Sequence, residues 1–183
     1  MKNLRFSVSN LKVSMKIKGV KFIDVIRIKG ISYNLCQRNF AILSRRYTYI
    51  FFRESCNGII HVNVTKLKNY REIFTSKKNL CDILPTIDII SLKVDNICSV
   101  LKLQKPLRLE EIFNSFSGKY PLKYQTQKFS GLFIKLQHAT AILFRTGSVI
   151  IVGVKNPYKL MSVHNSVENI ILNDISNHNV SAF

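Results

Sequence analysis

The chain has 183 residues, of which 46% are hydrophobic, and 28 Lys and Arg residues against 10 Asp and Glu residues give a formal net charge of +18. This length and composition are enough to bury a core, and they exclude a chain that is mainly disordered. No run reaches the roughly 18 uninterrupted apolar residues of a membrane-spanning helix, and the first residues alternate in polarity, unlike a signal peptide. We therefore expect a soluble intracellular protein without a membrane partner.

The charge is spread unevenly along the chain. Residues 1–85 carry a net charge of +13, and residues 86–183 carry +5. An excess of this size favours a polyanionic partner, with nucleic acid as the first candidate. Two other readings stay open, because Lys-rich surfaces also occur in proteins that bind no nucleic acid, and AT-rich coding sequence enriches Lys, Asn and Ile.

In the first half of the chain, four elements are predicted in order. Residues 8–14 alternate in polarity and predict a strand. Residues 20–28 predict a short amphipathic helix that ends before Gly30. The β-branched runs within 40–64 predict antiparallel strands with a turn at 56–58, and apolar residues from Leu67 to Leu84 keep helical spacing.

The second half repeats this order. Residues 94–100 predict a strand, and 106–116 predict a short helix that begins at a proline and ends before Gly118. Strands follow within 129–154 around a turn at Thr146 and Gly147, and residues 160–175 predict a closing helix. The sequence thus predicts two repeats, 1–85 and 86–183, joined at Pro85 and Thr86.

Two such repeats predict an α+β protein in which an antiparallel sheet carries its helices on one face. In the strand 149–154 nearly every residue is apolar, so both faces of the sheet are apolar. The helices can cover only one of these faces. An uncovered apolar face of more than a few hundred square ångströms usually marks a binding surface.

The side chains that carry catalysis or bind metals are scattered. No CxxC pair or His at ligand spacing accompanies the four cysteines, so we expect neither a zinc site nor a disulfide framework, and no metal. No paired carboxylates, activated nucleophile or phosphate loop is present, so we expect no enzyme, no cofactor and no small-molecule substrate. The residues concerned are Cys36, Cys56, Cys81, Cys98, His61, His138, His164 and His178.

Three stretches resemble the TATA-binding protein family. Residues 94–112, VDNICSVLKLQKPLRLEEI, are similar to the family's second-repeat segment QNIV…FPIRLEGL. Residues 124–132, YQTQKFSGL, are similar to YEPELFPGL, and 144–155, FRTGSVIIVGVK, to FxSGKVVxTGAK. In the first repeat, residues 50–64 fit only with extra residues in the turn.

The resemblance implies a TBP-like saddle, in which two pseudo-symmetric repeats form a curved antiparallel β-sheet with helices on the convex face. The concave face would bind and bend A·T-rich double-stranded DNA through its minor groove, and proteins of the transcription machinery would bind the convex face. The family is a standard example of minor-groove binding with apolar wedges. The protein would then act in transcription initiation in the nucleus. A large nuclear DNA virus as the source would account for the divergence and the composition, and the site of action would then be the host nucleus.

The resemblance also assigns a DNA-binding role to individual residues. The paired asparagines would donate to minor-groove acceptors, the phenylalanines would wedge into base steps, aliphatic residues would line the concave floor, and basic residues would contact the backbone. The asparagines are Asn10 and Asn96; the wedges are Phe129 and Phe144 in the second repeat and Phe52 and Phe40 in the first; the floor residues are Ile60, Val62, Ile150 and Val152; the basic residues are Lys12, Arg45, Arg46 and Lys135.

The sequence departs from the family pattern at several positions. Ser148 and Gly58 replace the lysines that follow the turn glycines, and Val62 and Val152 replace threonines of the concave strands. The acidic residues that help to dock transcription factor IIB, and the proline after Phe129, are also replaced; these positions hold Gln125, Gln127, Lys128 and Ser130.

Because of these departures, two alternatives to DNA binding stay open. One is a TBP-fold protein-interaction module in transcription that has lost specific DNA binding and docks a partner through its apolar sheet, so that the floor residues and phenylalanines are core. The other is an auxiliary domain of a nucleic-acid enzyme.

Overall fold

The structure is a computed structural model that describes residues 4–34 and 39–180, without the side chains of residues 174–180; Cys36 lies outside this part. The strands are β1 (Ser7–Lys18), β2 (Ile31–Tyr33), β3 (Phe40–Ser44), β4 (Thr48–Phe52), β5 (Ile60–Leu67), β6 (Asp88–Lys102), β7 (Leu122–Lys123), β8 (Gly131–Lys135), β9 (Thr140–Phe144) and β10 (Ser148–Val154). The helices are α1 (Phe22–Ile26), α2 (Arg71–Ile83), α3 (Leu109–Phe116), the 3₁₀ turn η1 (Pro157–Lys159) and α4 (Leu160–Val180).

Hydrogen bonds join the strands in the order β2-β3-β4-β5-β1-β6-β10-β9-β8-β7. The chain divides into two compact units. The first unit, residues 10–96, holds β2 to β5, most of β1 and the first part of β6. The second unit holds residues 97–180 together with residues 4–9, so that β1 and β6 contribute to both. The predicted α+β class with an antiparallel sheet is confirmed.

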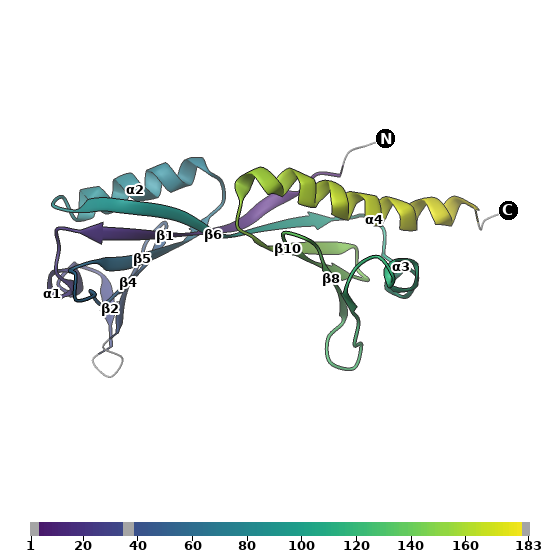
Figure 1. The fold of residues 1–183 in the computed structure, drawn as a ribbon, viewed down its shortest axis with the longest axis horizontal. Helices are drawn as coiled ribbons and strands as arrows, with labels where there is room; N and C mark the ends of the chain where they lie inside the picture. The colour runs from purple at the N-terminus through teal and green to yellow at the C-terminus, as the bar shows by residue number, and fades with distance from the viewer. Residues whose placement is uncertain (1–3, 35–38, 181–183) are drawn as a thin grey trace. The chain divides into compact units, whose positions relative to one another are not determined.

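In the first unit, α2 covers one face of the strands (Figure 1). Alternate residues of β1 are fully buried beneath this layer, among them Val13, Met15 and Ile17. Tyr49 of β4 donates its hydroxyl to the backbone carbonyl of Ser76 in α2 at 2.9 Å. Burial raises the pKa of Tyr49 to about 12. This hydrogen bond lets a polar group lie inside the layer without the cost of an unsatisfied hydroxyl.

In the second unit, α4 lies along one face of β6 and β10 (Figure 1). The apolar stripe of the helix is buried, and so are alternate residues of the strands beneath it, as the 3.6-residue and 2-residue periods require. The helix contributes Val163, Val167, Ile170 and Ile171, and the strands contribute Ile97, Leu101, Ala141, Leu143, Val149, Ile151 and Val154.

His164 of α4 joins this layer to the start of the chain. Its Nε2 lies 2.8 Å from the hydroxyl of the fully buried Ser99. Its ring stacks on Phe6 with the centroids 4.4 Å apart. One turn further along α4, Glu168 accepts a hydrogen bond from the backbone N–H of Leu4 at 2.9 Å. Burial lowers the pKa of His164.

The lowered pKa of His164 makes stability depend on pH. The unfolded chain takes up a proton on this histidine near pH 6.5, before the folded protein does, so folding is favoured above that pH and the benefit is lost as the pH falls through the folded pKa. Between about pH 7.5 and about pH 5 we expect the free energy of unfolding to fall more in the natural protein than in His164→Gln, which keeps a hydrogen-bonding group but cannot titrate. Urea unfolding at both pH values measures the difference, and equal losses in the two proteins would contradict it.

The element prediction needs two corrections. Leu67, predicted as helical, is the last residue of β5 and pairs with Leu11. The helix α2 begins only at Arg71, after Asn69, whose side-chain oxygen accepts from the backbone N–H of Glu72 at 3.1 Å. The strand predicted at 94–100 starts earlier, at Asp88. Both differences arise because strand pairing extends the local pattern beyond the point where its alternation is visible.

Candidate nucleic-acid interface

Each unit has an open sheet face opposite its helix, marked by partly exposed residues that alternate with the buried ones. In the first unit this open face carries Asn10, Lys12, Ser14, Phe40, Ile42, Thr48, Ile50, Phe52, His61, Asn63 and Thr65. In the second unit it carries Cys98, Val100, Phe133, Lys135, Thr140, Ile142, Phe144, Ser148, Ile150 and Val152. The prediction that the helices leave one sheet face uncovered within each unit is therefore confirmed.

Strand pairing defines which residues of the two units are equivalent. The β1–β5 register shifts between Leu11 and Val13, and the β6–β10 register shifts between Ile151 and Val154. Each shift inserts one extra residue in a left-handed conformation, Lys66 (φ 67°) in one strand and Gly153 (φ 89°) in the other. Such a bulge fixes the register of the strand pair.

The bulges give Asn10 and Asn96 the same position in the two repeats. Leu11 pairs with Leu67, which follows the bulge at Lys66, and Ile97 pairs with Val154, which follows the bulge at Gly153. Asn10 and Asn96 each precede one of these two buried residues, and both are partly exposed. The structure therefore places the two predicted asparagines equivalently.

The predicted floor residues of the first repeat are placed differently. Ile60 and Val62 are fully buried on the helix-covered side, so the expectation that they line the open face is wrong. The intervening residues His61 and Asn63 point to the open face instead. A one-residue change of register moves every side chain of a strand to the other face, and the longer turn before β5 hid this register in the sequence.

The same register corrects the assignment of the threonines. Thr65 pairs with Thr48, just as Val152 pairs with Thr140. Thr65, not Val62, is thus the first-unit equivalent of Val152. The first unit keeps a hydroxyl at this position of β5, and the second unit does not. Ile150 and Val152 lie on the open face, as expected.

An aromatic cluster ends the open face of the second unit. The rings of Phe129 and Phe144 meet edge to face with centroids 5.7 Å apart, and Phe133 lies 4.9 Å from Phe129. Gly131 makes room for this ring, because a Cβ there would lie 2.6 Å from Phe129 Cε1. Phe129 remains 41% exposed. The cluster is therefore packed on one side and accessible on the other.

The first unit also has an aromatic pair, in which Phe52 matches Phe144 and Phe40 takes the ladder position of Gly131. Phe40 and Phe52 face each other across β3 and β4, with ring centroids 6.5 Å apart. Phe52 is 36% exposed, whereas its neighbour Phe51 is fully buried. In the ladders, Phe52 is equivalent to Phe144, since the two occupy the same position relative to Thr48 and to Thr140 in their strands.

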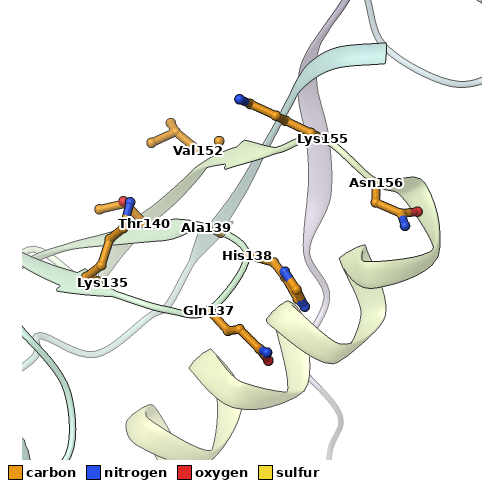
Figure 2. A pocket seen from close by; sticks show the side chains of 9 residues that line it. Lys135, Gln137, His138, Ala139, Thr140, Val152, Lys155 and Asn156 are labelled. Carbon is orange, nitrogen blue, oxygen red and sulfur yellow. The ribbon is translucent and has the colours of Figure 1, made fainter. Parts of the chain in front are cut away.

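Basic side chains lie at the edge of the second open face. Figure 2 shows Lys135, Thr140 and Val152 on the side of the strands away from α4, with Lys155 nearby. These residues line a cavity of about 390 Å³. The cavity is also lined by Gln137, whose side chain points toward α4 (Figure 2). Lys12 is partly exposed on the open face of the first unit.

The two predicted arginines are held toward the helix side. Arg46 bonds the carboxylate of Glu72 in α2 at 3.2 Å, and Arg45 donates to the backbone carbonyl of Lys29 at 3.4 Å. The pKa of Glu72 is lowered, first by the hydrogen bond from the backbone N–H of Lys68 and then by Arg46. Both arginines are exposed, but neither lies on the open face in the way that Lys12 does.

Residues 91–173 match the family model of "Transcription factor TFIID (or TATA-binding protein, TBP)". This part of the chain, within the second repeat, is similar to the TATA-binding protein family. The TBP of Methanococcus jannaschii has a similar fold, with a TM-score of 0.74 and 21% sequence identity over 92% of this chain and 99% of that chain. No curated protein has a significantly similar sequence. The predicted TBP-like fold is thereby confirmed, and the predicted resemblance of the second repeat to the family is matched by the family model.

Within this TBP-like fold, the sequence had not indicated His61, Asn63, Thr65 and Lys155 as site residues. The signal that could have identified the residues of β5 is the alternation of buried and open positions. Counting in steps of two from the bulge at Lys66 toward the start of β5 gives the residues on each face. Among residues 4–34 and 39–180 with described side chains, no group of three His, Cys, Asp or Glu residues could hold a metal ion. In the same part of the chain, no helix has the length and apolar character needed to cross a membrane.

Proposed function

We propose that this TBP-like factor initiates transcription in the nucleus by binding and bending A·T-rich duplex DNA through the minor groove, with the open faces of both units as the contact surface. The observation that carries the proposal is the repeated arrangement on these faces. Each repeat presents an asparagine at the same position of its long strand and, at the end of an open face, a phenylalanine pair of which one ring is exposed.

The asparagines supply the hydrogen bonds of this contact. The minor groove presents the acceptors adenine N3 and thymine O2 at almost the same place in A·T and T·A pairs. The amide groups of Asn10 and Asn96 can donate to both without distinguishing them. Such a contact favours A·T-rich DNA but does not distinguish an A·T pair from a T·A pair.

The phenylalanines supply the bend. Apolar side chains inserted from the minor groove partly unstack a base step and kink the duplex, and the wider groove then covers more apolar protein surface. Phe129 and Phe144 would unstack one base step, and Phe40 and Phe52 would unstack another. Ile150 and Val152 would contact the groove floor between the wedge and the asparagine.

The basic residues supply steering and much of the affinity. Every phosphate neutralised by Lys or Arg releases condensed counterions, so this part of the affinity weakens as salt rises. Lys12, Lys135 and Lys155 lie where a backbone could pass the open faces. The opposite sides of α2 and α4 would then be left for proteins of the transcription machinery, and Phe74 and Met161 are 74% and 68% exposed there.

A binding titration tests the proposal. The protein is titrated with an A·T-rich and a G·C-rich duplex of equal length, each at about 50 mM and about 200 mM salt. We expect tighter binding to the A·T-rich duplex and, if six or more phosphates are contacted, a loss of affinity on the order of 1,000-fold between the two salt concentrations.

The other outcomes of this titration are also informative. Equal affinity for the two duplexes together with steep salt dependence would show nonspecific binding and contradict minor-groove selection. Absence of binding to either duplex would contradict the proposal as a whole, and would support the protein-interaction module that the losses at Ser148 and Val152 suggest.

A further inference from the structure

The open faces of the two units have opposite chemical character at their centres. In the first unit, Asn63 of β5 lies between Ser14 of β1 and Ile50 of β4. In the second unit, the equivalent residue is Ile150 of β10, between Val100 of β6 and Ile142 of β9. An amide thus stands in one unit where the other has an entirely aliphatic row.

Further hydrogen-bond acceptors lie near Asn63 on the open face of the first unit. Ser14 donates its hydroxyl to the carboxylate of Asp95 at 3.1 Å, which brings an anionic group to this part of the face. Thr65 adds a hydroxyl two residues after Asn63, where the second unit has Val152. No described residue forms a hydrogen bond with the side-chain amide of Asn63. The amide is half-buried and can turn either its oxygen or its nitrogen outward.

This difference matters because the minor groove distinguishes base pairs by one donor. A·T and T·A pairs present only acceptors, whereas a G·C pair adds the guanine N2 amino group. An amide oxygen, with a carboxylate nearby, can accept a hydrogen bond from that amino group. An aliphatic side chain such as Ile150 buries the amino group without a partner, which is costly. The Asn63 amide can also donate to A·T acceptors after rotation.

We propose that the protein reads its DNA site asymmetrically: the half contacted by the first unit accepts G·C pairs opposite Asn63, and the half contacted by the second unit requires A·T pairs opposite Ile150. Asn63 is the residue that relaxes the specificity. The inference rests on the proposed function, since it assumes that both open faces contact one duplex. It implies that the sequence of a composite site, A·T-rich at one end only, sets the direction in which the factor binds.

A set of three duplexes tests the inference. The parent is an A·T-rich palindrome, and the other two carry G·C pairs at the floor positions of one half or of both halves, since the two halves of a palindrome are equivalent. The natural protein should bind the single-half duplex almost as well as the parent, because it can choose the direction that places G·C opposite Asn63. The duplex substituted in both halves should bind about 10-fold more weakly or worse, as for a typical mismatched base pair.

Two reciprocal variants sharpen the test. With Asn63→Val, a single-half substitution should already weaken binding about 10-fold relative to the parent, because neither half then tolerates guanine. With Ile150→Asn, the affinity for the doubly substituted duplex should recover. The matched control is Asn79→Val, the same substitution in α2, which should leave the relative affinities for the three duplexes unchanged.

The possible failures are distinguishable. If the natural protein binds the parent duplex but already binds the single-half duplex about 10-fold more weakly, and Asn63→Val changes nothing, asymmetric recognition is overturned while minor-groove binding stands. If the natural protein fails to bind even the parent, the proposed function itself is overturned. Thermal unfolding of each variant checks that the fold is intact.

Discussion

Replacing Phe129 and Phe144 together with Ala should abolish the bending of an A·T-rich duplex while leaving the protein folded. The two rings contact each other and Phe133 on the open face, and Phe129 is 41% exposed. Truncating them therefore removes the wedge and little of the helix-covered core. Without a side chain between the base steps, the unstacking that produces a kink no longer occurs.

The measurement is energy transfer between dyes at the two ends of a short duplex, whose separation falls when the duplex bends. The natural protein should raise the transfer efficiency, and the double variant should leave it near the value of free DNA at saturating concentration. Phe74→Ala is the matched control, because this residue of α2 is 74% exposed on the other side of its unit. If the double variant bends DNA as the natural protein does, Phe129 and Phe144 are not wedges.

Replacing Gly147 with Ala should strongly destabilise the fold. Gly147 lies in the turn between β9 and β10 with φ 82°, where its N–H bonds the carbonyl of Phe144. A Cβ at this position would lie 2.5 Å from the backbone oxygen of Lys105 and 3.0 Å from that of Leu103. Left-handed geometry costs an L-residue about 1–2 kcal/mol, and displacing two backbone segments adds to this. We expect a total loss of about 3 kcal/mol or more.

Gly58 offers a matched control for this prediction. It lies in the turn before β5 with φ 66°, and nothing stands within 4 Å of a Cβ built on it. Gly58→Ala should therefore cost only the conformational part, about 1–2 kcal/mol. Urea unfolding of both variants measures the two losses. Equal losses would show that the backbone around Leu103 and Lys105 yields freely and that the contact is not what fixes this turn.

The alternation and helical spacing of the sequence predicted most of the fold. Strand β1, the two short helices and α4 lie close to the predicted ranges, because local periodicity reports directly which side of an element is buried. Repetition of the order strand, short helix, strands, long helix then indicated two related halves. The boundary between β5 and α2 escaped this reasoning, since an apolar residue such as Leu67 suits both elements equally.

The site was predictable only in part. Asn10, Asn96, Phe129 and Phe144 were predicted because their spacing follows family motifs. The structure places the two asparagines equivalently in the two repeats and the two phenylalanines at the end of the second open face. Ile60 and Val62 were misplaced, because the length of the turn before β5 leaves the register undetermined and a single residue reverses the faces. The direction of the Arg46 side chain could not be predicted from the sequence, because it depends on the ion pair with Glu72 of α2, 3.2 Å away.

The sequence by itself determined most of the elements, the repeat, the excess positive charge and the resemblance to a family, because each depends on the type and spacing of nearby residues. Only the tertiary structure decided which side chains share a surface. The bulges at Lys66 and Gly153 set the register, and cross-strand hydrogen bonds then brought Asn63 opposite Ser14 and Ile150 opposite Val100. Such pairings join residues distant in the chain, so no local pattern contains them, and the difference between the two open faces becomes visible only once the strands are paired.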